Sequence, residues 1–285
     1  MRTLLLLLTG LTLSATALAA QVPSPIQLPQ ASPAASVSQA VGPATVAIEY
    51  HRPAVKARPV WGALVPYGQV WRTGANDATR IRFSDPVRVQ GQEVPAGTYA
   101  LFAIPTEKSW TMILNKKYEQ WGAFAYSQAE DQLRFELTPS ATEPQEWLRY
   151  TIEPKGESSA SVQLAWEKLA VEFTIEVDSE KLVLAQIDKA VAEAKPGDAR
   201  VFYTAARYYL DKGLSTEKAM AWIDKSIEIE DGFRARELKA RLANRDGKKA
   251  LAVEQLEKAI ELAKGKASPA ALDGLNRLLA EYKAK

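Results

Sequence analysis

The period of the hydrophobic pattern changes once along the chain, at Asp178, and this change divides the protein into two parts. From residue 44 to residue 177, apolar side chains recur at every second position in a series of short runs, which is typical of β-strands. Beyond Asp178 the apolar positions recur with a period of about 3.6 residues, which is typical of amphipathic helices. We therefore expect a strand-rich part followed by a helical part.

The strand-rich part is assigned to residues 35–178. It contains a series of alternating runs, among them ATVAIEYH, TYALFAI and WTMILNK, which are separated by turn signals such as PAG and EPKGESS. Short strands with turns every eight to twelve residues or so are typical of antiparallel sandwiches. The predicted fold class is α+β multidomain, with an antiparallel β-sandwich or jelly roll followed by helices. Trp110 and Trp166 lie in alternating runs and are expected in the core.

The helical part, residues 179–285, contains an internal repeat. Its copies are AQIDKAVAEA at 185–194, AWIDKSIEIE at 221–230 and EQLEKAIELA at 254–263, with offsets of 36 and 33 residues. A repeat of about 34 residues is typical of helical hairpins of the tetratricopeptide kind. Because such stacks usually need three or more units, we expect these helices to pack against the sandwich or another subunit. Grooves in such stacks bind peptides, so a protein partner is expected here. Helix ends are predicted at Asp198, Gly213, Ser215 and Ser268.

The first twenty residues, MRTLLLLLTGLTLSATALAA, combine one arginine, a short apolar run and small residues at Ala17 and Ala19. This is the pattern of a secretory signal peptide, so we expect cleavage after Ala19 and an exported protein, periplasmic or secreted. Residues 21–34 carry four prolines and no charge, which indicates an extended tether. The chain has no cysteine, so we expect neither a lipoprotein anchor nor a disulfide. We also expect no membrane span after signal cleavage.

Composition argues against several function classes. With 36 basic and 34 acidic residues, the chain has no general positive field, so no nucleic-acid partner is predicted. One histidine and no cysteine do not supply the usual ligands of a transition metal. The sequence also contains no calcium-loop, phosphate-loop or nucleophile-elbow motif. We therefore predict no metal and no cofactor.

One long stretch resembles a known family. The segments VPYGQVWRTGAN, PAGTYALFAIP and WTMILNK follow one another at compact spacing, and this order is similar to that of an exported bacterial family called domain of unknown function 2911. The resemblance covers roughly residues 30–178 and implies the sandwich fold and export, but no activity. His51 stands where this family more usually has a small residue, and Asp77 where it commonly has glutamate.

The densest run of unusual residues is YHRPAVKARPVWGALVPYGQVWRTGAND, residues 50–77. Its prolines remove ladder donors, so we expect residues 53–76 to leave the sheet as a long irregular excursion, and such excursions often carry sites. Arginine matches anionic or hydroxyl groups, and aromatic rings stack on sugars. The candidate ligand-binding residues are Arg52, Trp61, Tyr67, Trp71, Arg72, Asn76 and Asp77, with His51, Arg58, Tyr118 and Trp121 as secondary candidates.

The same residues also have a structural interpretation. Trp71 could fill the core, and Arg72 could pair with Glu49 or Asp77. The glycines of the run could serve left-handed turns, which other residues adopt only at a cost.

Three functions follow from these alternatives. The first is a non-enzymatic exported module that binds a small polar or saccharide-like ligand and carries a protein-interaction tail. The second is a hydrolase-type enzyme with Asp77 or Glu49 as base and Arg72 as an electrostatic clamp. The third is a purely structural or interaction protein. A solvent-reachable pocket containing Arg72 and Asn76 would favour the first two, and full burial of the run would favour the third.

Overall fold

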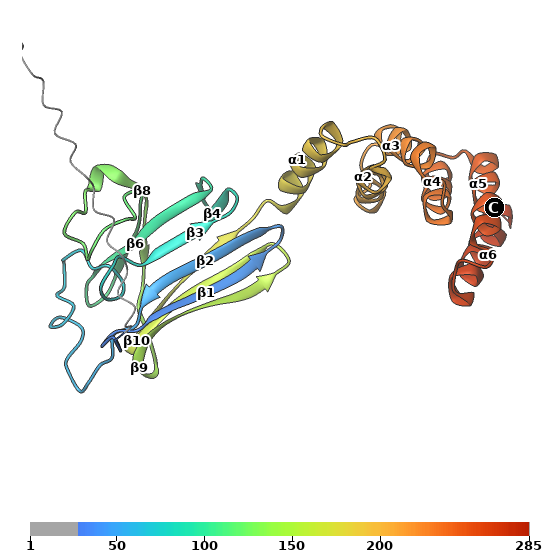
Figure 1. Cartoon of the computed structure of the whole chain (residues 1–285). Helices are drawn as coiled ribbons and strands as arrows, with labels where there is room; N and C mark the ends of the chain where they lie inside the picture. Colours follow the sequence, from blue (N-terminus) through green and yellow to red (C-terminus); the bar gives the residue numbers. More distant parts are fainter. Residues whose placement is uncertain (1–27, 285) are drawn as a thin grey trace, which may run out of the picture.

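The computed structural model describes residues 28–284 and shows two parts, a pair of β-sheets and a row of helices (Figure 1). This confirms the predicted α+β architecture. The expected signal peptide, residues 1–20, lies outside the described residues, as does the first half of the expected tether. Within the described chain, no helix has the length and apolar character needed to cross a membrane.

The strands form two sheets in which all paired neighbours run antiparallel. One sheet has six strands in the order β1-β2-β3-β6-β7-β8, and the other has four in the order β5-β4-β10-β9. The strands are β1 (Ala34–Val41), β2 (Ala44–His51), β3 (Arg80–Phe83), β4 (Val87–Val89), β5 (Gln92–Val94), β6 (Gly97–Pro105), β7 (Trp110–Asn115), β8 (Asp131–Leu137), β9 (Ser140–Gly156) and β10 (Ser159–Glu176).

The main core lies between the two sheets. Val46 and Ile48 of β2 are fully buried there, as their alternation predicts. Phe135 of β8 meets Phe173 of β10 edge to face, with ring centroids 5.4 Å apart, so the sheets pack face to face. The runs SVQLAW and VEFTIEV, which alternate separately, belong to one long strand, β10. A bulge separates them at Glu167, where the register shifts and φ is 56°.

Four tryptophans form a cluster in this core. Trp110 and Trp166 come from β7 and β10, whereas Trp61 and Trp71 come from the connection between β2 and β3. Their ring centroids lie 4.6 to 6.1 Å apart. The prediction that Trp110 and Trp166 are core residues is confirmed. Trp71 is only 9 % exposed, so it fills the core and has no face free for a ligand.

The connection between β2 and β3 is the expected irregular excursion. It forms no strand and makes only isolated bridges, such as Ala54 with Trp147 and Trp71 with Ala103. Trp71, which is buried, Trp61, which is partly buried, and these bridges hold it against one end of the sandwich (Figure 1). Aromatic pairs of this geometry contribute about 0.5–1.5 kcal/mol beyond their buried area, so the excursion is an ordered part of the fold.

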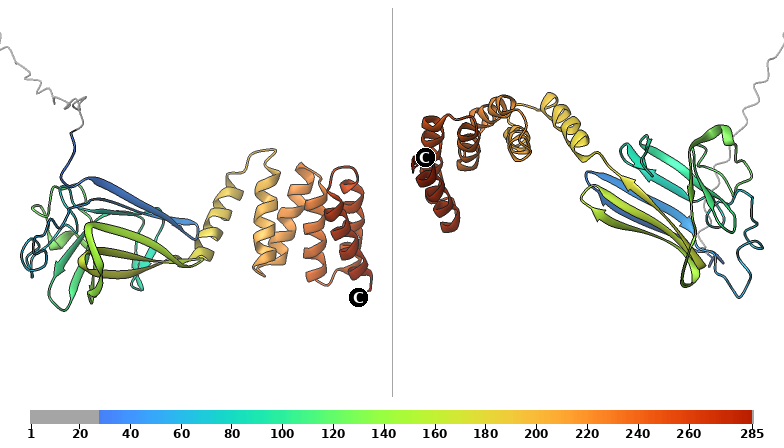
Figure 2. Two further views of the ribbon diagram at one scale, coloured as in Figure 1. Left: turned by 90° about the horizontal axis from the view of Figure 1, so that it is seen from below. Right: turned by 180° about the vertical axis from the view of Figure 1, so that it is seen from behind.

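Six helices follow β10 and pack on one another in sequence order (Figure 2). Ser215 caps α3 by accepting a hydrogen bond from the Lys218 N–H at 3.3 Å, and α6 begins at Pro269, as predicted. The assignment to the tetratricopeptide kind stays a prediction. The helices are α1 (Ser179–Ala192), α2 (Ala199–Asp211), α3 (Thr216–Ile229), α4 (Phe233–Arg245), α5 (Lys249–Ala263) and α6 (Pro269–Ala284).

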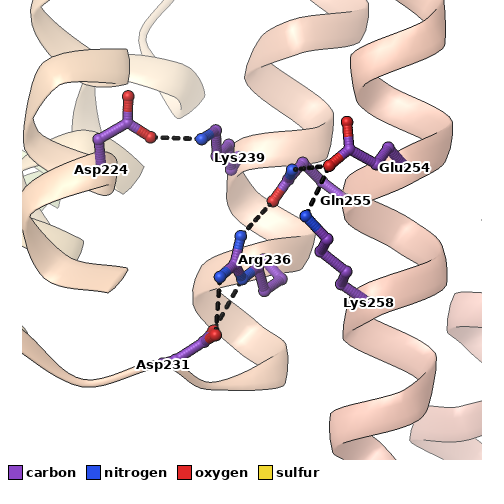
Figure 3. A network of polar contacts seen from close by, with 7 residues as sticks. All are labelled: Asp224, Asp231, Arg236, Lys239, Glu254, Gln255 and Lys258. Atoms are coloured by element: carbon purple, nitrogen blue, oxygen red, sulfur yellow. Dashed lines mark hydrogen bonds and ion pairs between the residues drawn. The ribbon is translucent and has the colours of Figure 1, made fainter. Parts of the chain in front are cut away.

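A polar network links α3, α4 and α5 (Figure 3). Arg236 donates to Asp231 at 2.7 Å and to Gln255 at 2.8 Å, and Lys239 pairs with Asp224 at 2.6 Å. The hydrogen bond from Arg236 lowers the pKa of Asp231. Because Gln255 is buried and its amide oxygen is satisfied by Arg236, this network sets how α4 meets α5.

The helical part extends away from the sandwich (Figures 1 and 2). Of the two expected supports for the helices, the sandwich is thus not used, and packing against another subunit stays a prediction. The junction of β10 and α1 holds the two parts together. There Ser179 Oγ lies 2.6 Å from Ser158 Oγ, and Leu182 packs against the sandwich core. The helices bury their apolar faces in two clusters of their own, so they do not need the sheets as a cover.

The tryptophan cluster leads to a stability prediction with a built-in control. We expect Trp110→Ala to lower the free energy of unfolding by about 3–5 kcal/mol, because it leaves a large cavity in the core. Trp121→Ala removes the same side chain from a position that is 60 % exposed, so it should change stability by less than about 0.5 kcal/mol. Urea unfolding of the full chain measures both. Similar urea midpoints for the two variants would contradict the prediction that the tryptophan cluster stabilises the core.

Candidate functional site

The face of the six-stranded sheet that points away from the core carries a cavity of about 420 Å³. Alternation along β2 directs Val46, Ile48 and Tyr50 inward and leaves Glu49 and His51 on the opposite face. The cavity lies where β1 begins, β2 ends and β3 begins. Its lining residues are Ala34, Ala35, Ser36, Glu49, Tyr50, His51, Asp77, Ala78 and Arg80.

Strand register brings the polar lining together. Glu49 of β2 stands directly opposite Ser36 of β1 on one side and Arg80 of β3 on the other. His51, two residues beyond Glu49 on β2, stands opposite Ala34 of β1. Residues that face each other across antiparallel strands direct their side chains to the same side of the sheet. Three strands therefore present one row of polar groups, and the small side chain of Ala34 leaves space beside it.

Asp77 reaches the cavity from the end of the excursion. It pairs with Trp121 as an isolated antiparallel bridge, and two backbone hydrogen bonds flank this bridge. The Ala78 N–H donates to the Gln120 carbonyl at 3.0 Å, and the Gly122 N–H donates to the Asn76 carbonyl at 2.9 Å. Because bridge partners direct their side chains to the same side, the Trp121 ring lies on the side of the Asp77 carboxylate. This ring is exposed to solvent.

The loop that carries Trp121 also covers part of the outer sheet face. Beneath it, Phe102 of β6 and Ile113 of β7 are buried in a small second core, against which the partly buried Tyr118 and Tyr126 pack. The Arg80 guanidinium lies 6.0 Å from the centre of the Tyr118 ring, at the boundary between the covered and the open half. The cavity thus occupies the open half of the face, next to an aromatic loop.

The polar side chains of the cavity have few partners in the protein. We call Glu49, His51, Asp77 and Arg80 the polar tetrad. Within the described chain, the side chains of Glu49, His51 and Asp77 form no hydrogen bond or ion pair, and Arg80 only contacts the Tyr118 ring. Glu49 and Arg80 stand opposite each other and yet form no ion pair. Unpaired groups in a concave surface are available to an external partner.

The run WRTGAND does not form the pocket that its composition suggests. Thr73 is fully buried, and its hydroxyl donates to the Leu101 carbonyl at 2.8 Å. The Thr73 carbonyl in turn accepts hydrogen bonds from Thr79 and from Tyr150, both at 3.1 Å. A Cβ on Gly74 would lie 2.9 Å from Thr79 Oγ1 and 3.1 Å from the His51 carbonyl, so this glycine permits close packing. Most of the run is therefore structural, and its last residue alone, Asp77, lines the cavity.

The three candidate arginines also lie outside the cavity lining. Arg52 donates from Nε to the Leu148 carbonyl at 2.9 Å, which ties the excursion to β9. Arg58 donates to the Ala54 carbonyl at 2.6 Å within the excursion itself. Arg72 does not pair with Glu49 or Asp77; its Nε is buried without a partner, and burial lowers its pKa. The sequence suggested these residues for ligand contacts, but the structure places them in or beneath the excursion.

The remaining candidates separate into two groups. Trp61 packs in the tryptophan cluster and Tyr67 stands at the excursion, partly exposed, so neither lines the cavity. Asn76 has a positive φ of 57° and donates weakly to the Ser32 carbonyl at 3.4 Å. By contrast His51 lines the cavity, and Tyr118 and Trp121 adjoin it through Arg80 and Asp77. The cavity lining thus takes its residues from the two ends of the dense run, Tyr50, His51 and Asp77, and from the strands beside them, Glu49 and Arg80.

Sequence reasoning did not single out Arg80 and Ser36 as site residues. Alternation places each of them on an outward face, but it does not say which strands are neighbours. The pairing of β2 with both β1 and β3 is the missing information. Among residues 28–284, no three acidic or histidine side chains are grouped so that they could hold a metal ion.

The buried hydrogen bond from the Tyr150 hydroxyl to the Thr73 carbonyl can be tested through its dependence on pH. Burial is the largest effect on this phenol and raises its pKa well above the usual value. The unfolded chain ionises its tyrosines near pH 10, so the contribution of the neutral phenol is present below about pH 10 and is lost as the pH rises above it.

We expect Tyr150→Phe to cost about 1 kcal/mol at pH 8, because the hydrogen bond to Thr73 is lost. Between pH 10 and 11 the wild type should lose about 1 kcal/mol that the variant does not lose. Urea unfolding at several pH values measures the difference, which should shrink as the pH rises. A difference that stays constant or grows would show that the phenol is not held neutral in the native state.

Comparison with known proteins identifies a family and no function. A family model described as "Protein of unknown function (DUF2911)" matches residues 32–175, slightly more than half of the 285 residues. The matched segment contains nearly all of both sheets and ends before the first helix. No curated protein matches the chain.

Proposed function

The chain belongs to the DUF2911 family of proteins of unknown function, and from this premise we propose that it is a non-enzymatic module that binds a small polar, saccharide-like ligand in the outer-face cavity. One observation carries the proposal: the polar tetrad lines a preformed cavity and is almost without partners in the protein. The cavity volume of about 420 Å³ lies within the range of roughly 300–1,000 Å³ that is usual for small-molecule sites.

The chemistry of the lining fits a ligand with several hydroxyl groups. Carboxylates accept hydrogen bonds from hydroxyls, and the Arg80 guanidinium donates to hydroxyl or carboxylate oxygens. Trp121 supplies an exposed aromatic face beside Asp77, on which the apolar face of a sugar ring can stack. The excursion provides Asp77, and Arg80 takes the place that the sequence suggested for Arg72.

A pair of serines on β1 provides a matched test. Both lie exposed on the outer face, but Ser36 lines the cavity and Ser38 does not. We expect at least one compound in a panel of monosaccharides, disaccharides, nucleotides and cell-wall fragments to raise the melting temperature of the wild type. Ser36→Trp fills the cavity and should abolish that shift, whereas Ser38→Trp should keep it. The proposal fails if nothing in the panel binds, or if Ser36→Trp binds as well as the wild type. In that case the structural alternative gains support.

A second candidate function rests on a separate observation: two carboxylates, Glu49 and Asp77, line the same cavity. They could serve as base and acid of a hydrolase-type reaction, with Arg80 as the electrostatic group. Under this hypothesis Asp77→Asn or Glu49→Gln should reduce turnover about a hundredfold or more on whichever ester or glycoside is cleaved. Full activity in both variants would remove the enzyme hypothesis and leave the binding proposal intact.

We also propose that the protein is exported, with the mature chain beginning at Ala20 or Gln21. The support is the order of charge, apolar run and small residues in the first twenty positions. N-terminal sequencing of the protein from cells that produce it would identify the first residue. Recovery of the intact chain with Met1 would contradict export by this route.

The helical part is proposed to dock a protein partner. A groove of about 550 Å³ between α1 and α2 is lined mainly by apolar side chains, among them Ile187, Ala190 and Val201. Asp198 and Arg200, both at the start of α2, add one charge of each sign to the lining and suit an amphipathic helical peptide that also carries charge. Peptides selected from a displayed library against the full chain should lose binding to Ala190→Glu. Selected peptides that bind this variant equally well would place the docking surface elsewhere.

A further inference from the structure

The charge in the cavity points to a narrower class of ligand. We infer that the ligand carries a protonated amino group next to hydroxyls, as an amino sugar does. This inference rests on the proposed binding function and deepens it. The tetrad contains two carboxylates and one guanidinium, so with His51 neutral its formal charge is −2 + 1 = −1. The ligand that complements such a lining is cationic.

Among residues 28–284, no basic side chain forms an ion pair with either carboxylate. Arg80 is the basic residue that lines the cavity with them, and it contacts Tyr118 and forms no ion pair with Glu49. Arg82, two residues further along β3, is exposed and lies outside the lining. Arg52, which follows His51, donates from Nε to the Leu148 carbonyl. Both carboxylates therefore keep their hydrogen-bonding capacity for a donor that comes from outside.

An ammonium group suits this arrangement better than a metal ion. It offers three N–H donors, which can be shared between carboxylates that do not converge on one point. The acidic and histidine side chains of the described chain are not grouped as metal ligands, so a bare cation lacks its coordination shell here. An exposed tryptophan beside a carboxylate also attracts an ammonium through its ring face.

The sugar component of the inference rests on Trp121 and Arg80 together. An exposed aromatic ring can stack on the apolar face of a sugar, and a guanidinium can donate to the hydroxyls at its edge. A simple alkylamine uses only the carboxylates. The tightest ligands should therefore combine the amine with a sugar ring.

Three oligosaccharides of equal length and linkage test the charge directly. Oligomers of glucosamine, N-acetylglucosamine and glucose differ only in whether each ring carries an ammonium, an acetamide or a hydroxyl. We expect the glucosamine oligomer to bind the full chain about tenfold more tightly than the other two in calorimetry at about 20 mM NaCl, with each carboxylate contributing about three- to fivefold. At about 500 mM NaCl the advantage should fall below about threefold, because salt screens exposed charges.

Variants that remove one negative charge show which carboxylates cause the preference for the glucosamine oligomer. Asp77→Asn and Glu49→Gln should each lower the ratio of glucosamine affinity to glucose affinity about three- to fivefold, because the amide keeps an acceptor oxygen for hydroxyls but loses the charge that attracts an ammonium. Glu176→Gln makes the same change of net charge on β10, in the other sheet, and should leave the preference as it is. Two independent variants keep the test valid if one of them folds poorly.

The outcomes separate this inference from the proposed function. If all three oligomers bind equally and Ser36→Trp abolishes their binding, the cavity is a saccharide site and the amine preference is overturned. If ethanolamine binds as tightly as glucosamine, the sugar component is overturned. If none of these compounds binds at either salt concentration, both the inference and the saccharide-binding proposal fail.

Discussion

The arrangement of the β part depends on the burial of Trp61 and Trp71 from the excursion against Trp110 and Trp166 from the strands. This contact fastens a long irregular segment, rich in proline and glycine, to the core of the sandwich. Hydrogen bonds to the Thr73 carbonyl then fix the last part of the segment before β3. Buried hydrogen bonds and aromatic packing together make the path of the excursion specific, and the position of Asp77 follows from that path.

The two faces of the six-stranded sheet serve different purposes. The inner face packs on the second sheet and supplies the main core. On the outer face, the loop around Trp121 covers β6 and β7 with a small apolar cluster and leaves β1, β2 and β3 open. Glu49, Asp77 and Arg80 line the cavity in this open half of the face and form no ion pair with one another. The candidate site thus exists because the loop around Trp121 covers only part of the outer face of the six-stranded sheet.

The helical part follows other rules. Its helices are stabilised by small residues that allow close approach, such as Ala219 and Ala252, and by polar links such as Arg236 to Gln255. Because these contacts lie within the helical row, the row extends from the sandwich and meets it at the junction of β10 and α1. A ligand in the cavity and a partner in the groove between α1 and α2 would therefore occupy separate parts of the molecule.

Local patterns in the sequence determined the local structure. The change of hydrophobic period at Asp178 predicted the order of sheets and helices, the alternation along ATVAIEYH predicted the inward residues of β2, and Ser215 marked the start of α3. The candidate residues were predicted less well, because the sequence drew attention to the dense run and the cavity uses Asp77 and His51 from that run together with Arg80. Period two determines the face on which a side chain lies, but neither the neighbouring strand nor its register. Only the tertiary structure decided that Glu49 stands between Ser36 and Arg80, because long-range strand pairing is selected by the packing of the whole sandwich.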